Sequence, residues 1–431
     1  MASAGGQDES GDDSDSEVNK KSGQTSTQSG DAVKAPTQSG TGSVGTANTN
    51  SDTQSGKGTG SGGTQVAAAI AVNYMRATTD ALIDNSVTLA ASGAVVVEVE
   101  TQVTAKAIAD ATAFDSNATT GVAAAVGLNI SEVDAKARIG NSANVTGGSV
   151  AVRSVQPTDT KNSYQVRALA GAASKGTTIG GSIAVNYVDS SSIAEIGNSS
   201  TITATAAGGV IVSADSHNEI QNLAGGAALT ASSSAGVGIA VSVNIVNTLE
   251  TKATVGTGTT INANSGGVTI EADASLVPFT ELIDLDVIGE VSLSFTNFAA
   301  GVAASSGGAA IGGSSSVNVM FVRTTASVGA NSTINADGNI TVFAHDMMTL
   351  FTAAGGIGLS GGNAGVGIGI DVNVIDRETK ATIGSSADLI TTGGQSRSQI
   401  RLRRQADDRR GDVRPVDQRD RRRGINQRCC V

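Results

Sequence analysis

The segment GVGIAVSVNIVNTLETKATVG, residues 236–256, carries the pattern that decides the fold. Its first half alternates strictly between two kinds of side chain. The apolar set is Val237, Ile239, Val241, Val243 and Ile245, and the small or polar set between them is Gly238, Ala240, Ser242 and Asn244. An alternation with a period of two, rich in β-branched residues, predicts a β-strand and argues against a helix.

Versions of this segment recur six times along the chain. Each predicted strand ends in an Asn, at Asn73, Asn129, Asn186, Asn244, Asn318 and Asn373, with spacings of 56, 57, 58, 74 and 55 residues. A Gly follows eleven residues after four of these Asn residues; the offset is twelve at Gly256, and Asp84 takes the place in the first copy. A fixed period of this length indicates stacked supersecondary units.

A second alternating strand follows a turn in four copies, at 149–154, 209–216, 267–274 and 339–346. One repeat cannot bury its apolar face alone, but stacked repeats can. We therefore predict an all-β solenoid, a parallel β-helix-like rod of about six imperfect repeats. Two or three coils per repeat, about 4.8 Å apart, are expected. A propeller is less consistent, because its blades are shorter and carry aromatic signatures.

The two faces of each strand raise separate expectations. The Val and Ile face is expected to be buried, so that Val241→Asp would place an unpaired carboxylate in the interior and break the stack locally. The face of Gly, Ala and Ser permits two interpretations. It forms either a flat exposed wall or a contact between sheets that only small residues allow.

Composition and charge restrict the classes of function. Aromatic residues make up 2% of the chain and Trp is absent, which disfavours a large aromatic-lined pocket. Residues 1–395 contain 16 Lys and Arg against 34 Asp and Glu. This excess of negative charge disfavours nucleic acid and anionic membranes as partners. We expect no transmembrane segment, no cofactor and no secretion signal in these residues.

Three regions follow from these patterns. Residues 1–62 are rich in Gly, Ser, Thr and Gln, which predicts a disordered linker. Residues 63–394 are the repeats, with an insertion at 275–308. Residues 395–431 contain 12 Arg and lose the alternation. A reading-frame shift that left an unstructured basic tail is the preferred interpretation, and a tail that binds nucleic acid or membrane is the alternative.

Few residues suggest a site. Within the insertion, Glu281, Asp284, Asp286 and Glu290 are weak candidates for binding a cation or a glycan, although the alternation there also predicts an ordinary hairpin. The six Asn residues could form a ladder of side-chain amides or cap the strand ends, a structural role either way. His217 and His345 could stack as a pair, but solvated turn positions are the simpler interpretation. We expect no metal site, because no Cys and His cluster has ligand spacing.

The pattern GVGxxVxVNxxxxxTKAxIG resembles the repeats of leukotoxin-type filamentous adhesins and other giant bacterial surface proteins. The best copies are residues 236–256 and 365–384, and the resemblance extends over residues 63–394. It implies an extracellular or cell-surface fragment of a bacterial rod. Such a rod would adhere by multivalent contact with a host or neighbouring-cell receptor or glycan, and it could self-associate. A β-helix enzyme of the polysaccharide-lyase or glycosidase type is the alternative.

Overall fold

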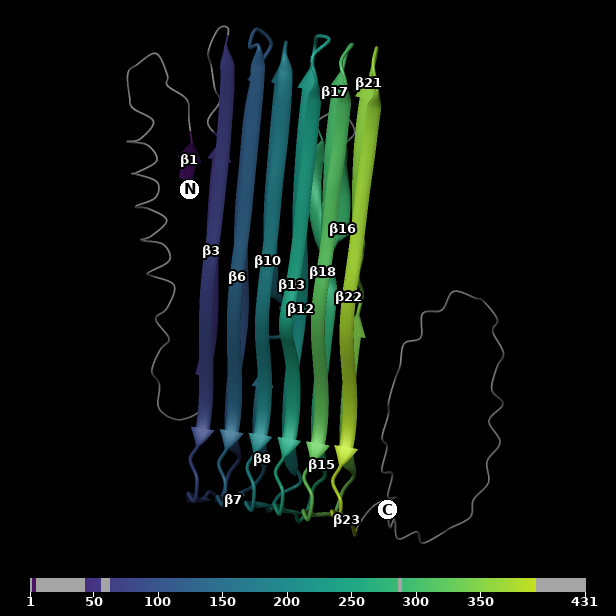
Figure 1. The fold of residues 1–431 in the computed structure, drawn as a ribbon. Coiled ribbons are helices and arrows are strands. Elements are labelled where there is room, and N and C mark those ends of the chain that lie inside the picture. The colour runs from purple at the N-terminus through teal and green to yellow at the C-terminus, as the bar shows by residue number, and fades with distance from the viewer. Residues whose placement is uncertain (1, 5–42, 56–62, 286–288, 393–431) are drawn as a thin grey trace, which may run out of the picture.

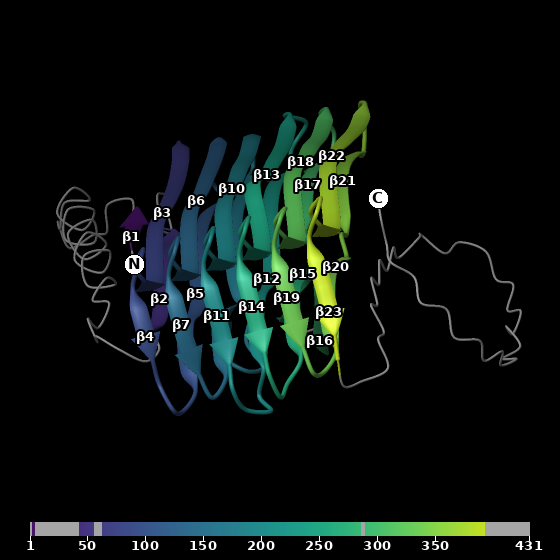
Figure 2. The ribbon, with the colours of Figure 1, turned by 90° about the horizontal axis from the view of Figure 1, so that it is seen from below.

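The computed structural model describes residues 2–4, 43–55, 63–285 and 289–392, and every regular element among them is a β-strand. The chain winds through three stacked parallel sheets, which confirms the predicted all-β solenoid (Figures 1 and 2). Its six coils stack over about 24 Å, so this part of the predicted rod is shorter along its axis than its long strands, which span about 65 Å. The prediction of two or three coils per repeat is wrong. Each repeat makes a single coil, because its main strands are about 20 residues long rather than five or six.

The first sheet, here called the long sheet, contains the strands predicted from the Asn repeats. Its members are β3 (Thr64–Ile83), β6 (Thr120–Ile139), β10 (Thr177–Ile196), β13 (Gly236–Val255), β18 (Ala310–Val328) and β22 (Gly365–Ile383). They pair in sequence order with matching repeat positions opposite each other, as predicted. The Asn residues lie in the middle of these strands rather than at their ends; Asn129, for example, is followed by ten more residues of β6.

Two further sheets complete each coil. The short sheet contains β4 (Thr88–Ala90), β7 (Asn144–Gly147), β11 (Thr201–Ala204), β14 (Thr260–Ala263), β19 (Thr333–Ala336) and β23 (Asp388–Thr391). The third, here called the divided sheet, contains β5 (Val95–Asp115), β8 (Val150–Val155), β9 (Asn162–Ser174), β12 (Val210–Thr230), β15 (Val268–Leu285), β17 (Asn297–Ser305), β20 (Ile340–Met348) and β21 (Thr352–Ser360). In three coils an interruption splits this third side into two strands.

Two stretches of the N-terminal segment are strands. Strand β2 (Ser43–Ser55) pairs in parallel with β5, and β1 (Ala2–Ala4) pairs with β2. The reason is that β5 offers an edge of free N–H and C=O groups, which a polar strand can satisfy through its main chain alone. The remaining residues of the predicted linker, and residues 393–431 with the predicted frame shift, lie outside the described residues.

The irregular repeat contains a hairpin that is shorter than the predicted insertion. Strand β15 continues beyond its pairing with β12 and turns back as β16 (Gly289–Phe295), which pairs antiparallel to it from Phe279 to Phe295. Residues on both sides of this hairpin pair with β12, because Pro278 lies opposite Ile220 and Asn297 opposite Asn222. The extra residues therefore branch off where β12 shifts its alternation, without breaking the stack.

The periodic Gly after each long strand is required by the coil beneath it. A Cβ on Gly197 would lie 2.6 Å from the carbonyl carbon of Gly140, and a Cβ on Gly140 would lie 2.7 Å from that of Asp84. Asp84 follows β3, which is the edge strand of the long sheet. Among the described residues no other long strand precedes β3 in that sheet, so a side chain fits at this position. The offset of twelve in the fourth copy is a bulge in β13, where the pairing with β10 skips Asn247.

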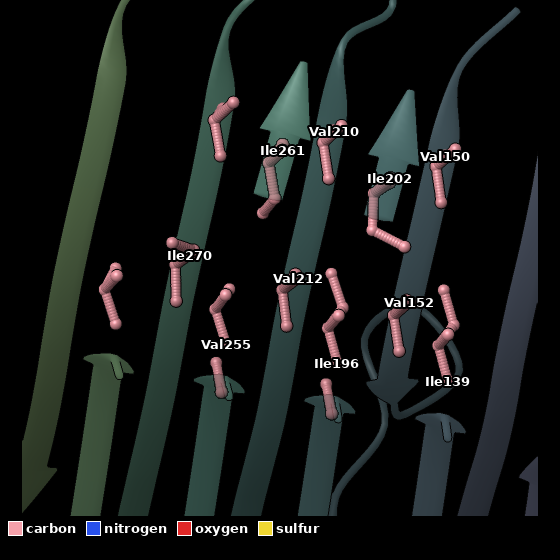
Figure 3. Packing of buried hydrophobic residues seen from close by; sticks show 14 of the residues in the cluster. Ile139, Val150, Val152, Ile196, Ile202, Val210, Val212, Val255, Ile261 and Ile270 are labelled. Atoms are coloured by element: carbon pink, nitrogen blue, oxygen red, sulfur yellow. The ribbon is translucent and has the colours of Figure 1, made fainter. Parts of the chain in front are cut away.

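In the second half of the long strands, the three sheets enclose a filled core. The inward residues form columns along the rod, such as Ile139, Ile196 and Val255 from the long sheet, with Ile202 and Ile261 from the short sheet (Figure 3). Three walls leave an interior wide enough for β-branched side chains, and burying each one stabilises the fold by about 1.5–3 kcal/mol. We call this part of the rod the three-sided region.

In the first half of the long strands, only two sheets face each other and they lie unusually close. The small residues point inward: a Cβ on Gly180 would lie 2.1 Å from the Ala227 carbonyl oxygen, and one on Gly226 would lie 2.1 Å from that of Ile239. Facing sheets normally lie about 10 Å apart, with interdigitated side chains between them. Here Gly, Ala and Ser remove those side chains. We call this part the compressed region.

Candidate interaction surfaces

The most conspicuous surface is the outward face of the long sheet in the compressed region, here called the outer wall. Its residues stand in columns across six strands: Val66, Val122, Ile179, Val237, Ile311 and Val366; Ala68, Ala124, Gly181, Ile239, Gly313 and Ile368; Ile70, Val126, Ile183, Val241, Ser315 and Ile370; Val72, Leu128, Val185, Val243, Val317 and Val372; and Tyr74, Ile130, Tyr187, Ile245, Val319 and Val374. Ile183 and Ile239 are 44% and 46% exposed, whereas Ala184 and Ala240 between these columns are fully buried.

The outer wall contradicts the expected burial of the Val and Ile face, and it decides between the two interpretations of the Gly, Ala and Ser face. The Val and Ile face was predicted to be buried, yet Val241 lies on the outer wall, so Val241→Asp would not bury a carboxylate. Of the two interpretations of the small residues, close sheet-to-sheet packing is the one observed. The physical reason is space, because the gap between the two sheets cannot accommodate a β-branched side chain.

Below the wall, the same face of the long sheet is charged. On β6 the outward residues change from Val126, Leu128 and Ile130 to Glu132, Asp134, Lys136 and Arg138. Ion pairs connect neighbouring positions: Arg138 Nη2 lies 2.6 Å from Asp80 Oδ2, and Arg323 Nη2 lies 2.5 Å from Asp376 Oδ2. Exposed pairs of this kind each contribute little to stability. Their charges make this half of the face polar, in contrast to the outer wall.

A ladder of buried amides separates the two regions. Each Nδ2 of the recurring Asn donates to Oδ1 of the next, at 2.6 Å from Asn73 to Asn129, 2.8 Å to Asn186, 3.3 Å to Asn244, 3.1 Å to Asn318 and 2.9 Å to Asn373. A buried amide needs such partners, since an unmade hydrogen bond costs about 1–3 kcal/mol. The ladder also fixes the register, because a slip of one residue would break every one of its bonds.

A second surface, on the divided sheet, gathers acidic groups that the sequence did not indicate. Asp215 of β12 lies opposite Asp273 of β15, which lies opposite His345 of β20, whose Nδ1 is 2.8 Å from Asp273 Oδ1. Burial, and then the charge of Asp273, raises the pKa of Asp215. Burial, and then the charges of Asp215 and Asp273, raises the pKa of Glu271. Aligning SADS, EADA and FAHD at 213–216, 271–274 and 343–346 would have revealed the column.

The two histidines do not form a pair and do not lie in turns. His217 is in β12, opposite Ser275, and its Nδ1 is 2.9 Å from Ser275 Oγ. His345 is in the column two residues away, with Asp215 and Asp273. The preferred interpretation, solvated turn positions, is wrong because both residues lie within strands. The alternative, a stacked pair, does not form because the register places the two side chains on different columns.

Three of the four acidic candidates of the insertion lie on the hairpin. Glu281 and Asp284 belong to β15, Glu290 belongs to β16, and Asp284 and Glu290 are directly opposite each other in the antiparallel register. Asp286 lies outside the described residues. The main-chain geometry is thus that of an extra hairpin. It brings two of the candidates onto neighbouring strands.

Within the described ranges, no group of three or more His, Cys, Asp or Glu residues is arranged to hold a metal ion. The same part of the chain contains no helix long and apolar enough to cross a membrane. Comparison with known proteins finds no matching family model, no matching curated protein and no matching solved structure. The function must therefore be inferred from the surfaces of the rod themselves.

Proposed function

We propose that this chain is a structural and adhesive segment of a secreted or cell-surface bacterial filament, which acts by multivalent contact along a rigid rod. The observation that supports the proposal is the register of the long sheet. Six strands are paired without a break, so equivalent outward residues recur along the rod once per coil, about every 4.8 Å. Weak contacts repeated at such a spacing combine into strong attachment.

The partner in this proposal is a receptor or glycan on a host or neighbouring cell. The Gly and Ala interior and the amide ladder leave little freedom for the coils to shift, which limits the entropy lost on binding. The buried core of the three-sided region also resists deformation, because close-packed interiors are hardly compressible. Rigidity and repetition together suit a filament that must hold its contacts in line.

The test is attachment as a function of ligand density. The chain is passed over immobilised glycans and cell surfaces prepared at low and high density, and its dissociation rate is measured on each. Multivalent contact predicts dissociation that slows steeply as the density rises. A dissociation rate independent of density, or no retention on any surface, would contradict the proposal.

A second candidate function is hydrolysis or lysis of a polysaccharide. The observation that favours it is the raised pKa of Asp215 and Glu271, since raised carboxyl pKa values are found in general acids. Incubation with acidic and neutral polysaccharides, followed by analysis of chain length, tests this candidate. Turnover abolished by Asp215→Asn, or by Asp284→Ala in the hairpin, would favour the enzyme over the adhesin.

A further inference from the structure

The outer wall is larger than the apolar surface that a monomer normally exposes. It spans six strands and eleven residues of β3, from Thr64 to Tyr74. At about 4.8 Å per strand and 3.3 Å per residue this is roughly 900 Å². Soluble monomers rarely expose contiguous apolar patches above a few hundred Å², whereas a stable interface buries about 800 Å² on each partner. The wall therefore has the size of one side of an interface.

Two glycines on the wall have no explanation within the chain. A Cβ on Gly181 or Gly313 would meet nothing within 4 Å, in contrast to the inward Gly180, where it would collide with backbone. Glycine weakens a strand interior, so its presence needs a reason. In their column, Gly181 and Gly313 lie on either side of Ile239, which projects from the wall. The wall thus has depressions next to a projection.

We propose that the wall binds the wall of a second copy of this chain, face to face, about a two-fold axis that runs parallel to the strands between β10 and β13. The coils of the two rods then run in opposite directions. Strand β10 faces β13 of the partner, β6 faces β18, and β3 faces β22. This register places Ile239 of each copy over Gly181 of the other, and Ile368 over Ala68. Each large side chain in that column thereby faces a small one.

The charged half of the long sheet is complementary in the same register. Asp80 faces Lys380, Asp134 faces Arg323, and Arg76 faces Asp376, while no like charges face each other among the outward positions of 76–83 and their counterparts. The neighbouring registers lack this match. A shift by one coil sets Ile239 against Ile239 and Glu250 against Glu250, and the opposite shift sets Asp189 against Asp189. Charge and shape thus select one arrangement.

The first test is mass in solution together with a zero-length cross-link. Sedimentation velocity on the full chain is expected to show a dimer. Carbodiimide treatment is expected to join Asp80 to Lys380. Within one chain these residues lie on the first and last of six strands, roughly 24 Å apart, so the link requires two copies. A monomer at micromolar concentration, or a dimer without this link, would overturn the proposal.

Matched variants on one strand separate pairing from folding. Ile183→Glu places a carboxylate in the wall opposite Val241, and each dimer carries the change twice. The dissociation constant is expected to rise on the order of 100-fold or more. Ile193→Glu, also outward on β10, lies between Lys136 and Lys252 and faces Lys252 of the partner, so the dimer should persist. Equal effects of the two variants on the dimer would contradict the proposal.

The third variant, Gly181→Val, fills the depression. Because nothing lies near this position in the chain, the melting temperature of the monomer should not fall, whereas the partner's Ile239 can no longer approach. Loss of the dimer with an unchanged circular dichroism spectrum is expected. An intact dimer would overturn the proposed register. None of these outcomes depends on attachment to a receptor, so this proposal and the adhesive one fail separately.

Discussion

The compressed and three-sided regions are built from the two halves of the same strands, yet they use opposite residues for their interiors. On β6 the inward side chains are Gly121, Ala123, Ala125 and Gly127 in one half, and Val133, Ala135, Ala137 and Ile139 in the other. Outward, Val and Leu give way to Glu, Asp, Lys and Arg. Hydrophobicity alone does not decide which face is inside. The available space does, because two sheets in contact leave no room and three leave a core.

Within the compressed region, the difference between the inward and the outward face is sharpest at paired glycines, where we expect the largest effects. On β12, a Cβ on Gly226 would lie 2.1 Å from the backbone oxygen of Ile239, whereas one on Gly225 would meet only the end of the Leu169 side chain, at 2.7 Å. Gly226→Ala is therefore expected to lower the free energy of unfolding by about 3 kcal/mol or more, since backbone cannot move aside. Urea unfolding measures the change.

The neighbouring variant is the control. Gly225→Ala should cost less than about 1 kcal/mol, because the Leu169 side chain can adopt another rotamer. If both variants lost the same stability, the two sheets of the compressed region would not be in the close contact described here.

Ile183 and Ile196 compare the regions on one strand. Both belong to β10, but Ile183 is 44% exposed on the outer wall and Ile196 is fully buried in the three-sided core. Ile196→Ala should cost about 2–5 kcal/mol because it removes buried methyl groups and leaves a cavity. Ile183→Ala should cost less than about 1 kcal/mol in the monomer. Thermal unfolding at low protein concentration is the measurement, and a larger loss at Ile183 would reverse our assignment of the faces.

These contrasts show how far the sequence alone could lead. The period of Asn186 and its equivalents predicted the stack, the long sheet and its register, because a period of two and a constant repeat length leave few other arrangements. The direction of the faces could not be predicted. Alternation of Ile183 with Ala184 separates two faces but does not state how far away the next sheet lies, and that distance is a property of all the coils together.

The candidate surfaces were less accessible to prediction for a similar reason. Asp215 and Asp273 lie in different repeats of similar but unequal lengths, so the period alone does not make them neighbours. Only an alignment of SADS with EADA, which the pairing of β12 with β15 shows to be the right one, brings them together. Gly181 was indistinguishable from Gly180 in the sequence. The structure separates them, since one is required by the fold and the other is not.

The amide ladder lies at the boundary of the two regions and tests how they are joined. In Asn186→Ala, Asn129 Nδ2 loses its 2.8 Å acceptor and Asn244 Oδ1 loses its 3.3 Å donor. We expect a loss of about 1–3 kcal/mol, because two buried amides each lose a hydrogen bond, although Asn129 Nδ2 keeps its bond to Ser131 Oγ. The same change at Asn373, whose Nδ2 is exposed, should cost less. Chemical denaturation of both variants compares the interior of the ladder with its last member.

The smallest expected effect concerns pH and contrasts two aspartates on the outer faces of the three-sided region. Burial and the charge of Asp273 raise the pKa of Asp215, so the folded state favours its protonated form. Its stabilising contribution is therefore present below the ordinary aspartate pKa of about 4 and is lost as the pH rises through the raised value. Asp215→Asn should raise the melting temperature at pH 7, and the difference from the parent chain should vanish in acid.

Asp134 should behave in the opposite way. Burial tends to raise its pKa, but hydrogen bonds from Lys136 and Ser191 outweigh burial and lower it. Its ionised form therefore stabilises the fold above the ordinary pKa, and that contribution disappears as the pH falls through the lowered value. Asp134→Asn should lower the melting temperature at pH 7 and have no effect in strong acid. If melting curves recorded across this range moved in the same direction for both variants, the two carboxylates would not differ in their surroundings. The acidic column on the divided sheet would then have no special electrostatic character.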